Sequence, residues 1–207
     1  MLSPIISPKS IVCYNGVMKS LRLSRPHAIM MVGLPGSGKS FFARQFAATF
    51  NAPYIDSLSI EAYAQNAEGA GAIITLVMGE IAKTNQTFIF EGNSDSRVRR
   101  AEFAKWARQL GYQPLFIWAQ VDQATSRDRT AKSKIMSQTD FEQANRTFSA
   151  PHPDEKAIVI SGKHTFASQA KVVLAHLSQE TRSDTPLVVQ QPHTPARPAG
   201  SRSIIIR

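Results

Sequence analysis

The sequence predicts an α/β fold with one parallel sheet of about five strands and helices on both sides. Short apolar runs alternate with amphipathic segments along residues 28–178, which is typical of parallel strands joined by right-handed crossovers. The 207 residues suffice for one such domain with a core and two tails. Hydrophobic residues make up 43% and charged residues 19%, so the composition excludes a disordered chain, a collagen-like fibre and a coiled coil.

Five continuous apolar runs predict the strands, because a strand buried on both faces shows no polar alternation. The first run reads AIMMV, and the third, TFIF, combines β-branched and aromatic residues. Trp118, at a strand end, and Trp106, on the apolar face of a helix, are expected in the core. The predicted strands are Ala28–Val32, Pro53–Ser57, Thr87–Phe90, Pro114–Trp118 and Lys156–Ile160.

Apolar residues three or four positions apart predict the helices between these strands. Phe42, Phe46 and Phe50 show this spacing on the first helix. Ser94 or Asp95 is the predicted N-cap of the helix that follows the third strand. The predicted helices are Lys39–Phe50, Gly69–Lys83, Ser94–Leu110, Gln123–Lys134, Thr139–Phe148 and Phe166–Leu177.

Composition divides the chain into a domain at residues 28–178 and two flanking segments. Residues 1–27 carry four basic and no acidic residues and resemble a transit peptide in composition. Three prolines would interrupt an amphipathic helix there, so a strand or loop added to the core is favoured. Residues 179–207 are Pro-rich and are predicted to form a poorly ordered tail that ends in the apolar sequence SIIIR.

The net charge of +9 lies mostly in the two ends of the chain. It indicates an anionic partner such as nucleic acid or a nucleotide, or else solvated tails beside a phosphate site. No apolar run reaches the length of a transmembrane helix, so none is expected. The single cysteine, Cys13, excludes an internal disulfide and a cysteine-based zinc cluster, and it favours a reducing, cytoplasmic location.

The segment GLPGSGKS follows the first strand and opens the first helix. It matches the phosphate-binding P-loop pattern, in which glycines let backbone amides turn toward a phosphate. The lysine reaches the β- and γ-phosphates, and the following serine supplies a hydroxyl to Mg²⁺. The predicted nucleotide-binding residues are Gly33, Pro35, Gly36, Ser37, Gly38, Lys39, Ser40 and Phe41.

A P-loop by itself does not distinguish kinases from other nucleotide-binding proteins. The chain has no N-K-x-D motif, which argues against a GTPase, and it is too short for an AAA+ motor with a helical lid domain. The P-loop between a buried strand and a helix predicts a P-loop NTPase fold, a three-layer sandwich with the sheet in the middle.

The order of several motifs resembles the P-loop kinases of AAA-type domain family 33. GLPGSGKS is followed by YIDS, by FIFEGN, by a basic helix ending in LGY, and by FIWAQVDQATSRDR. The resemblance covers roughly residues 28–178. This group includes 5′-hydroxyl polynucleotide kinases and is close to zeta toxins and chloramphenicol phosphotransferases. The resemblance therefore implies a kinase that uses ATP and Mg²⁺.

The resemblance implies catalytic or metal-binding roles for three residues in addition to Lys39. Asp56 matches the acid that accepts the proton of the attacking hydroxyl, although an acid at this place could also cap a helix. Ser40 and Glu91 would hold the metal. Glu91 stands where such kinases have Asp, and its extra methylene changes the reach of the carboxylate; a pairing with a neighbouring arginine is the alternative.

The resemblance also implies that Arg127 or Arg129 contacts the transferring phosphoryl group from a lid. The two arginines are two positions apart, so they cannot share one helix face. Asn93, Arg97 and Arg100 are candidates for binding the substrate, although a run of arginines is as often a solvated face.

Two functions remain open on the sequence alone. The first is an ATP- and Mg²⁺-dependent phosphotransferase, whose hydroxyl acceptor could be a nucleic-acid 5′ end, a small molecule or a nucleotide sugar. The second is an ATP-binding switch without phosphotransfer, whose basic tails bind an acidic or membrane partner. The enzyme is favoured if Asp56 and either Arg127 or Arg129 converge on the phosphate site.

Overall fold

A computed structural model describes residue 23 and residues 25–134 and 136–183, with side chains up to residue 179. Its centre is a five-stranded parallel sheet in the order β2-β3-β1-β4-β5. The strands are β1 (His27–Val32), β2 (Tyr54–Asp56), β3 (Phe88–Glu91), β4 (Gln113–Gln120) and β5 (Ile158–Ser161). The predicted five-stranded parallel sheet is therefore confirmed. Most of the N-terminal extension and of the C-terminal tail lies outside the described residues.

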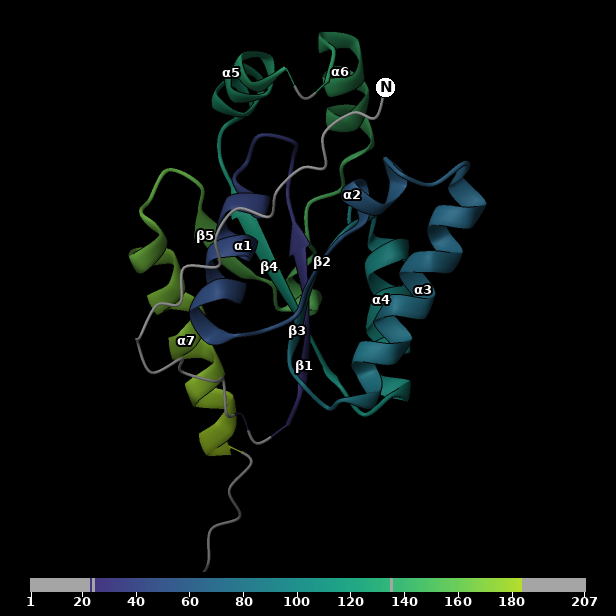
Figure 1. Cartoon of the computed structure of the whole chain (residues 1–207). Coiled ribbons are helices and arrows are strands. Elements are labelled where there is room, and N and C mark those ends of the chain that lie inside the picture. The colour runs from purple at the N-terminus through teal and green to yellow at the C-terminus, as the bar shows by residue number, and fades with distance from the viewer. Residues whose placement is uncertain (1–22, 24, 135, 184–207) are drawn as a thin grey trace, which may run out of the picture.

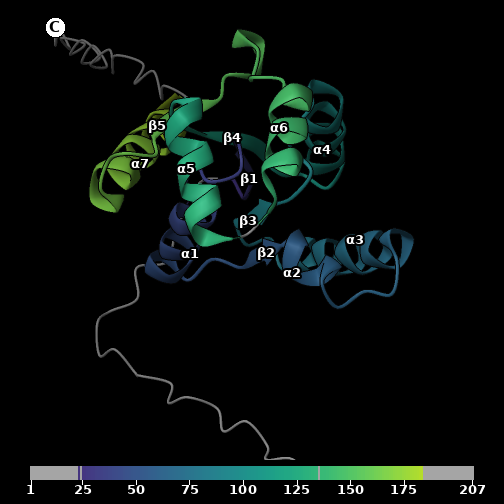
Figure 2. The same cartoon turned by 90° about the horizontal axis from the view of Figure 1, so that it is seen from above.

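Helices form the two outer layers around this sheet (Figure 1). α1 (Lys39–Phe50) and α7 (Phe166–Ser183) cover one face, and α3 (Ala67–Lys83) and α4 (Arg97–Gln109) cover the other. Two further helices, α5 (Gln123–Ser133) and α6 (Gln138–Thr147), lie beyond the carboxyl ends of the strands (Figures 1 and 2). The remaining elements are short: α2 (Ser57–Glu61) and a 3₁₀ turn, η1 (Pro153–Glu155).

The core consists of two hydrophobic clusters, one on each face of the sheet. Side chains alternate along β1, so Ile29 and Met31 belong to the cluster under α1 and α7, while Met30 belongs to the cluster under α3 and α4. Phe42 and Phe46 are fully buried with ring centroids 5.3 Å apart, as their spacing predicts. The central strand therefore separates two packed layers.

The structure differs from the sequence prediction at several element boundaries. α7 continues to Ser183, and α2 was not predicted because five residues are too few to show a helical period. The predicted N-cap of α4 is wrong: Ser96, not Ser94 or Asp95, accepts a hydrogen bond from the Arg99 amide at 3.4 Å. None of the helices in the described part of the chain has the length and hydropathy that crossing a bilayer requires.

The topology brings the carboxyl ends of β1, β2 and β3 together. The P-loop follows β1 directly, and Asp56 at the end of β2 pairs in register with Glu91 at the end of β3. The chain leaves β1 toward β2 on one side and later returns to β4 on the other. Ligands of open α/β sheets bind at such a reversal of strand order.

Candidate active site

The P-loop, residues 33–40, packs closely against α5. Gly36 has a φ of 77°, and a Cβ atom at this position would overlap with the carbonyl oxygen of Ser126. The Ser126 hydroxyl donates a hydrogen bond to the Pro35 carbonyl at 2.6 Å. Only glycine allows this approach, so the helix that follows β4 supports the shape of the loop.

Lys39 begins α1 and points its ammonium back into the loop. Its Nζ donates to the carbonyl oxygens of Gly33 at 2.9 Å and Leu34 at 3.0 Å. Burial lowers the pKa of Lys39 from its usual value, while the negative charge of Glu91 opposes this shift. An ammonium has three N–H donors, so one remains for a phosphate oxygen.

Ser40 and Glu91, the two residues predicted to hold a metal, contact each other. The Ser40 hydroxyl donates to Glu91 Oε1 at 2.7 Å, and the Tyr54 hydroxyl donates to Glu91 Oε2 at 2.6 Å. Burial, and then the hydrogen bond and charge of Glu91, raise the pKa of Tyr54 above its usual value. Tyr54 therefore stays protonated and holds the longer carboxylate in place.

These oxygen donors fit Mg²⁺, which proteins commonly hold through one or two carboxylates together with substrate phosphates and waters. No cluster of three or more His, Cys, Asp or Glu in the described part of the chain could hold a metal by itself. A metal at Ser40 and Glu91 would therefore take its other ligands from a nucleotide and from water.

Asp56 lies beside this pair at the adjacent strand end. Neighbouring strands are about 4.8 Å apart, which puts the Asp56 backbone next to that of Glu91. Asp56 occupies the N-cap position of α2 but makes no capping hydrogen bond with a backbone amide. Instead its Oδ2 accepts from Ser59 Oγ at 2.8 Å and from the Arg44 guanidinium at 3.3 Å.

The two lid arginines lie in different places. Arg129 donates to the Gly162 carbonyl at 2.9 Å and borders a cavity of about 480 Å³ together with the P-loop. Arg127 lines a separate cavity of about 200 Å³ between α5 and α6. Of the two, only Arg129 borders the same space as Lys39 and Ser40.

This P-loop cavity includes residues that the sequence analysis missed. They are contributed by α5, by the connection from β5 to α7 and by α7 itself: Ser133, Gly162, Lys163, His164 and Gln169. Lys163 also pairs with Asp122 at 2.6 Å. The sequence could have indicated those that follow β5, because residues after the last strand of a parallel sheet lie at the same edge of the sheet as the P-loop. Phe41, a predicted nucleotide-binding residue, lines the cavity and is exposed.

The remaining P-loop residues differ in their surroundings. Ser37 is buried, and its hydroxyl has no hydrogen-bond partner among the described residues. Gly38, with a φ of 98°, occupies the N-cap position of α1. The first amides of α1 therefore face the loop, where a helix N-terminus binds an anionic phosphate.

Arg100 is not placed to bind a substrate, which corrects the sequence-based expectation. It is fully buried, and its guanidinium donates to Glu155 at 2.7 and 3.1 Å and to the carbonyl oxygens of Ser94 and Ser149, each at 2.9 Å. It therefore fastens α4 to the segment around η1.

The exposed arginines at the start of α4 also have acidic neighbours. Arg97 pairs with Asp154 at 3.6 Å and does not line any cavity described here. Arg99 lies 3.7 Å from Asp95 and, unlike Arg97, borders the groove between α3 and α4.

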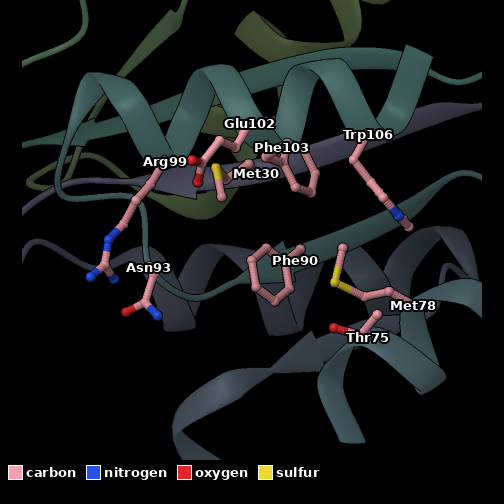
Figure 3. A pocket seen from close by; sticks show the side chains of 9 residues that line it. All are labelled: Met30, Thr75, Met78, Phe90, Asn93, Arg99, Glu102, Phe103 and Trp106. Atoms are coloured by element: carbon pink, nitrogen blue, oxygen red, sulfur yellow. The ribbon is translucent and has the colours of Figure 1, made fainter. Parts of the chain in front are cut away.

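A groove of about 560 Å³ lies between α3 and α4 (Figure 3). Asn93, the third residue predicted to bind substrate, lies at one end of it together with Arg99. Trp106 and Trp118 were both expected in the core. Each is partly buried and packs against the cluster under α3 and α4, and Trp106 also lines the other end of this groove.

Known structures share this fold. A gluconokinase from Sinorhizobium meliloti 1021 aligns with a TM-score of 0.59 and 14% identity, over 76% of this chain and 95% of that one. A sugar kinase from Janibacter sp. HTCC2649 aligns with a TM-score of 0.58 and 17% identity, over 78% of this chain and 99% of that one. No curated protein sequence matches the chain significantly. At these identities the likeness concerns the fold.

The family assignment rests on the sequence of the domain. A family model described as an AAA domain (AAA_33) matches residues 29–150, which is more than half of the chain. The match begins in β1 and includes the P-loop, Asp56, Glu91 and both lid arginines. The protein therefore belongs to the AAA domain family AAA_33 and has the fold of a P-loop kinase.

Proposed function

We propose that this protein is an ATP- and Mg²⁺-dependent kinase that transfers the γ-phosphate to a hydroxyl group. One observation carries the proposal: the P-loop hydroxyl of Ser40 lies 2.7 Å from the carboxylate of Glu91, with Asp56 at the next strand end. A metal-binding pair and a candidate base thus meet at the carboxyl edge of the sheet, beside Lys39.

The P-loop would bind the nucleotide through its amides and Lys39. The loop amides and the start of α1 surround the β-phosphate, and the Lys39 ammonium adds a positive charge. Ser40 and Glu91 would hold Mg²⁺, which would supply positive charge to neutralise the phosphate oxygens. Tyr54 orients Glu91 through the hydrogen bond at 2.6 Å.

Asp56 and Arg129 would act on the transferred group. The acceptor oxygen forms a bond to the γ-phosphorus as the bond to the β,γ-bridging oxygen breaks, and the hydroxyl proton passes to the Asp56 carboxylate. Arg44 orients that carboxylate at 3.3 Å. Arg129, which borders the P-loop cavity, would neutralise charge on the transferred phosphoryl group.

The test is transfer of labelled γ-phosphate from ATP to a panel of nucleosides, sugars and 5′-hydroxyl oligonucleotides in the presence of Mg²⁺. Lys39→Ala is expected to abolish labelling. Lys83→Ala removes a lysine that pairs with Glu80 on the exposed surface of α3 and should leave labelling unchanged. Equal activity of Lys39→Ala and the wild type would refute the proposal.

One observation favours the second candidate, an ATP-binding switch without phosphotransfer. The Asp56 carboxylate is engaged by Arg44 and Ser59, and it does not border the P-loop cavity. Asp56→Asn separates the two functions. In a kinase it lowers turnover far more than ATP affinity; in a switch no wild-type turnover exists, and ATP affinity is unchanged. Binding of an acidic partner by the tails stays a prediction.

A further inference from the structure

We propose that the groove between α3 and α4 binds the phosphate acceptor, and that this acceptor is a small hydroxyl compound with an aromatic ring. The inference rests on the proposed kinase activity and specifies its substrate class. We expect the groove to bind acceptors that carry an aromatic ring in preference to free sugars and sugar acids. The groove's volume of about 560 Å³ lies within the usual range of small-molecule pockets.

The walls of the groove are largely aromatic and thioether side chains. Phe90 and Phe103 are stacked, with ring centroids 5.7 Å apart and an interplanar angle of 12°. Trp106 lies 5.9 Å from Phe103, and Met30 and Met78 complete the apolar lining. Figure 3 shows Phe90 on one side of the groove and Phe103 on the other. Such a surface accepts the face or edge of a ring.

Four of the nine residues that line this groove are polar, and three of these lie toward one end. Asn93 and Arg99 are together there, with Glu102 nearby (Figure 3). The Thr75 hydroxyl, on the other side, already donates to the Gly71 carbonyl at 2.8 Å. A free sugar carries a hydroxyl on most of its carbons and would leave several of them unpaired against the rings. An acceptor with a ring at one end and hydroxyls at the other matches the lining.

The polar end of the groove is close to the proposed metal pair. Asn93 follows Glu91 by two residues, so their Cα atoms are at most about 7 Å apart. Glu91 in turn contacts Ser40 of the P-loop at 2.7 Å. An acceptor whose ring lies against this aromatic lining would therefore have its hydroxyl-bearing end beside the edge where the γ-phosphate would lie.

The start of α4 does not offer the free positive charge that a nucleic-acid strand requires. Arg100 is buried in its ion pair with Glu155, and Arg97 pairs with Asp154. Arg99, the arginine that borders the groove, lies 3.7 Å from Asp95, and Glu102 adds a negative charge. A small acceptor therefore fits this groove better than a polynucleotide does.

The experiment compares acceptors that differ only by the ring. Phenyl β-glucoside is paired with glucose, and uridine with ribose, in the labelled γ-phosphate assay with the full chain. The ring-bearing member of at least one pair is expected to show a kcat/KM about 10-fold or more above its partner. A 5′-hydroxyl oligonucleotide is included as the alternative class.

Two variants on α3 locate the binding site. Thr75→Trp places an indole in the groove, whereas Leu76→Trp places one on the adjacent, 64% exposed position that does not line it. Thr75→Trp should raise the KM for the ring-bearing acceptor about 10-fold and leave the KM for ATP unchanged. Leu76→Trp should change neither value. Calorimetric binding of the same acceptors to the nucleotide-free chain provides a readout that needs no turnover.

The outcomes separate this inference from the proposed function. If Lys39-dependent transfer occurs but free sugars or the oligonucleotide are preferred, the inference fails and the kinase stands. Equal acceptor KM values for Thr75→Trp and Leu76→Trp also overturn it. If no acceptor is labelled, the kinase proposal fails and with it the role of the groove as an acceptor site. Calorimetry then tests the groove alone: ring binding that Thr75→Trp removes supports a site for ring-bearing compounds, and no binding overturns it.

Discussion

Replacing Arg100 with methionine removes five hydrogen bonds from the interior of the protein while keeping an unbranched, largely aliphatic side chain. The guanidinium donates twice to Glu155 and once each to the carbonyl oxygens of Ser94, Ser149 and Ala150. Glu155 is 11% exposed and would remain as an uncompensated charge. Breaking a buried ion pair by removing one partner costs about 3–5 kcal/mol.

Thermal and urea unfolding followed by circular dichroism measure this loss. For a domain of this size, about 3–5 kcal/mol corresponds to a decrease in Tm of roughly 6–20 °C. Arg97→Met is the matched control, because Arg97 and Asp154 are 57% and 74% exposed and such pairs contribute about 0–1 kcal/mol. Glu155→Gln, which removes the charge of the other partner, gives an independent measurement should Arg100→Met fail to fold.

The effect of Arg100→Met should also depend on pH. Burial raises the pKa of Glu155, but the hydrogen bonds from Arg100 and from the His152 amide outweigh it, so the pKa lies below its usual 4.5. Stability from this carboxylate is therefore present above pH 4.5 and lost as the pH falls through the lowered pKa. The difference from the wild type should narrow in acid. A loss of stability equal to that of Arg97→Met at neutral pH, where Glu155 is ionised, would refute the structural role of Arg100.

Four further variants test the site. Tyr54→Phe should raise the Mg²⁺ concentration for half-maximal activity about 10-fold or more, because Glu91 loses a hydrogen bond that orients it; a Mg²⁺ titration measures this. Arg129→Ala should lower kcat on the order of 10³-fold and Arg127→Ala should not; similar kcat values for the two would contradict the assignment. Gly36→Ala should lower the free energy of unfolding by about 1–2 kcal/mol, because alanine is strained at the φ of Gly36. It should also weaken ATP binding, because the added Cβ would push the loop away from Ser126. Urea unfolding measures the first effect and ATP titration the second.

The geometry of the P-loop could be predicted because its information is local. A buried strand, the segment GLPGSGKS and an amphipathic helix are contiguous, so their spacing predicts both the loop and the placement of Lys39 and Ser40. Asp56 and Glu91 end strands of a parallel sheet, so the sheet edge brings them together. These relations follow from short segments and from one topological rule.

The groove and the arginines of α4 could not be predicted, because long-range contacts decide them. Arg99 and Arg100 are neighbours in sequence, and a turn of about 100° per residue separates their directions. Arg100 points inward because its guanidinium pairs with the carboxylate of Glu155, which lies 55 residues later in the chain. Trp106 carries the same core-like pattern as Phe103, but only the position of α3 leaves its ring open to a groove.

A single peptide step on β3 connects the two halves of the proposed site. Phe90 faces the groove between α3 and α4, and Glu91, the next residue, faces Ser40 and Tyr54. Because successive side chains of a strand point to opposite faces, substitutions on the groove face need not move the carboxylate. Substrate preference can therefore diverge, by natural variation or by engineering, on a phosphate-handling apparatus that stays the same. In this architecture a new acceptor requires a changed lining and no new chemistry.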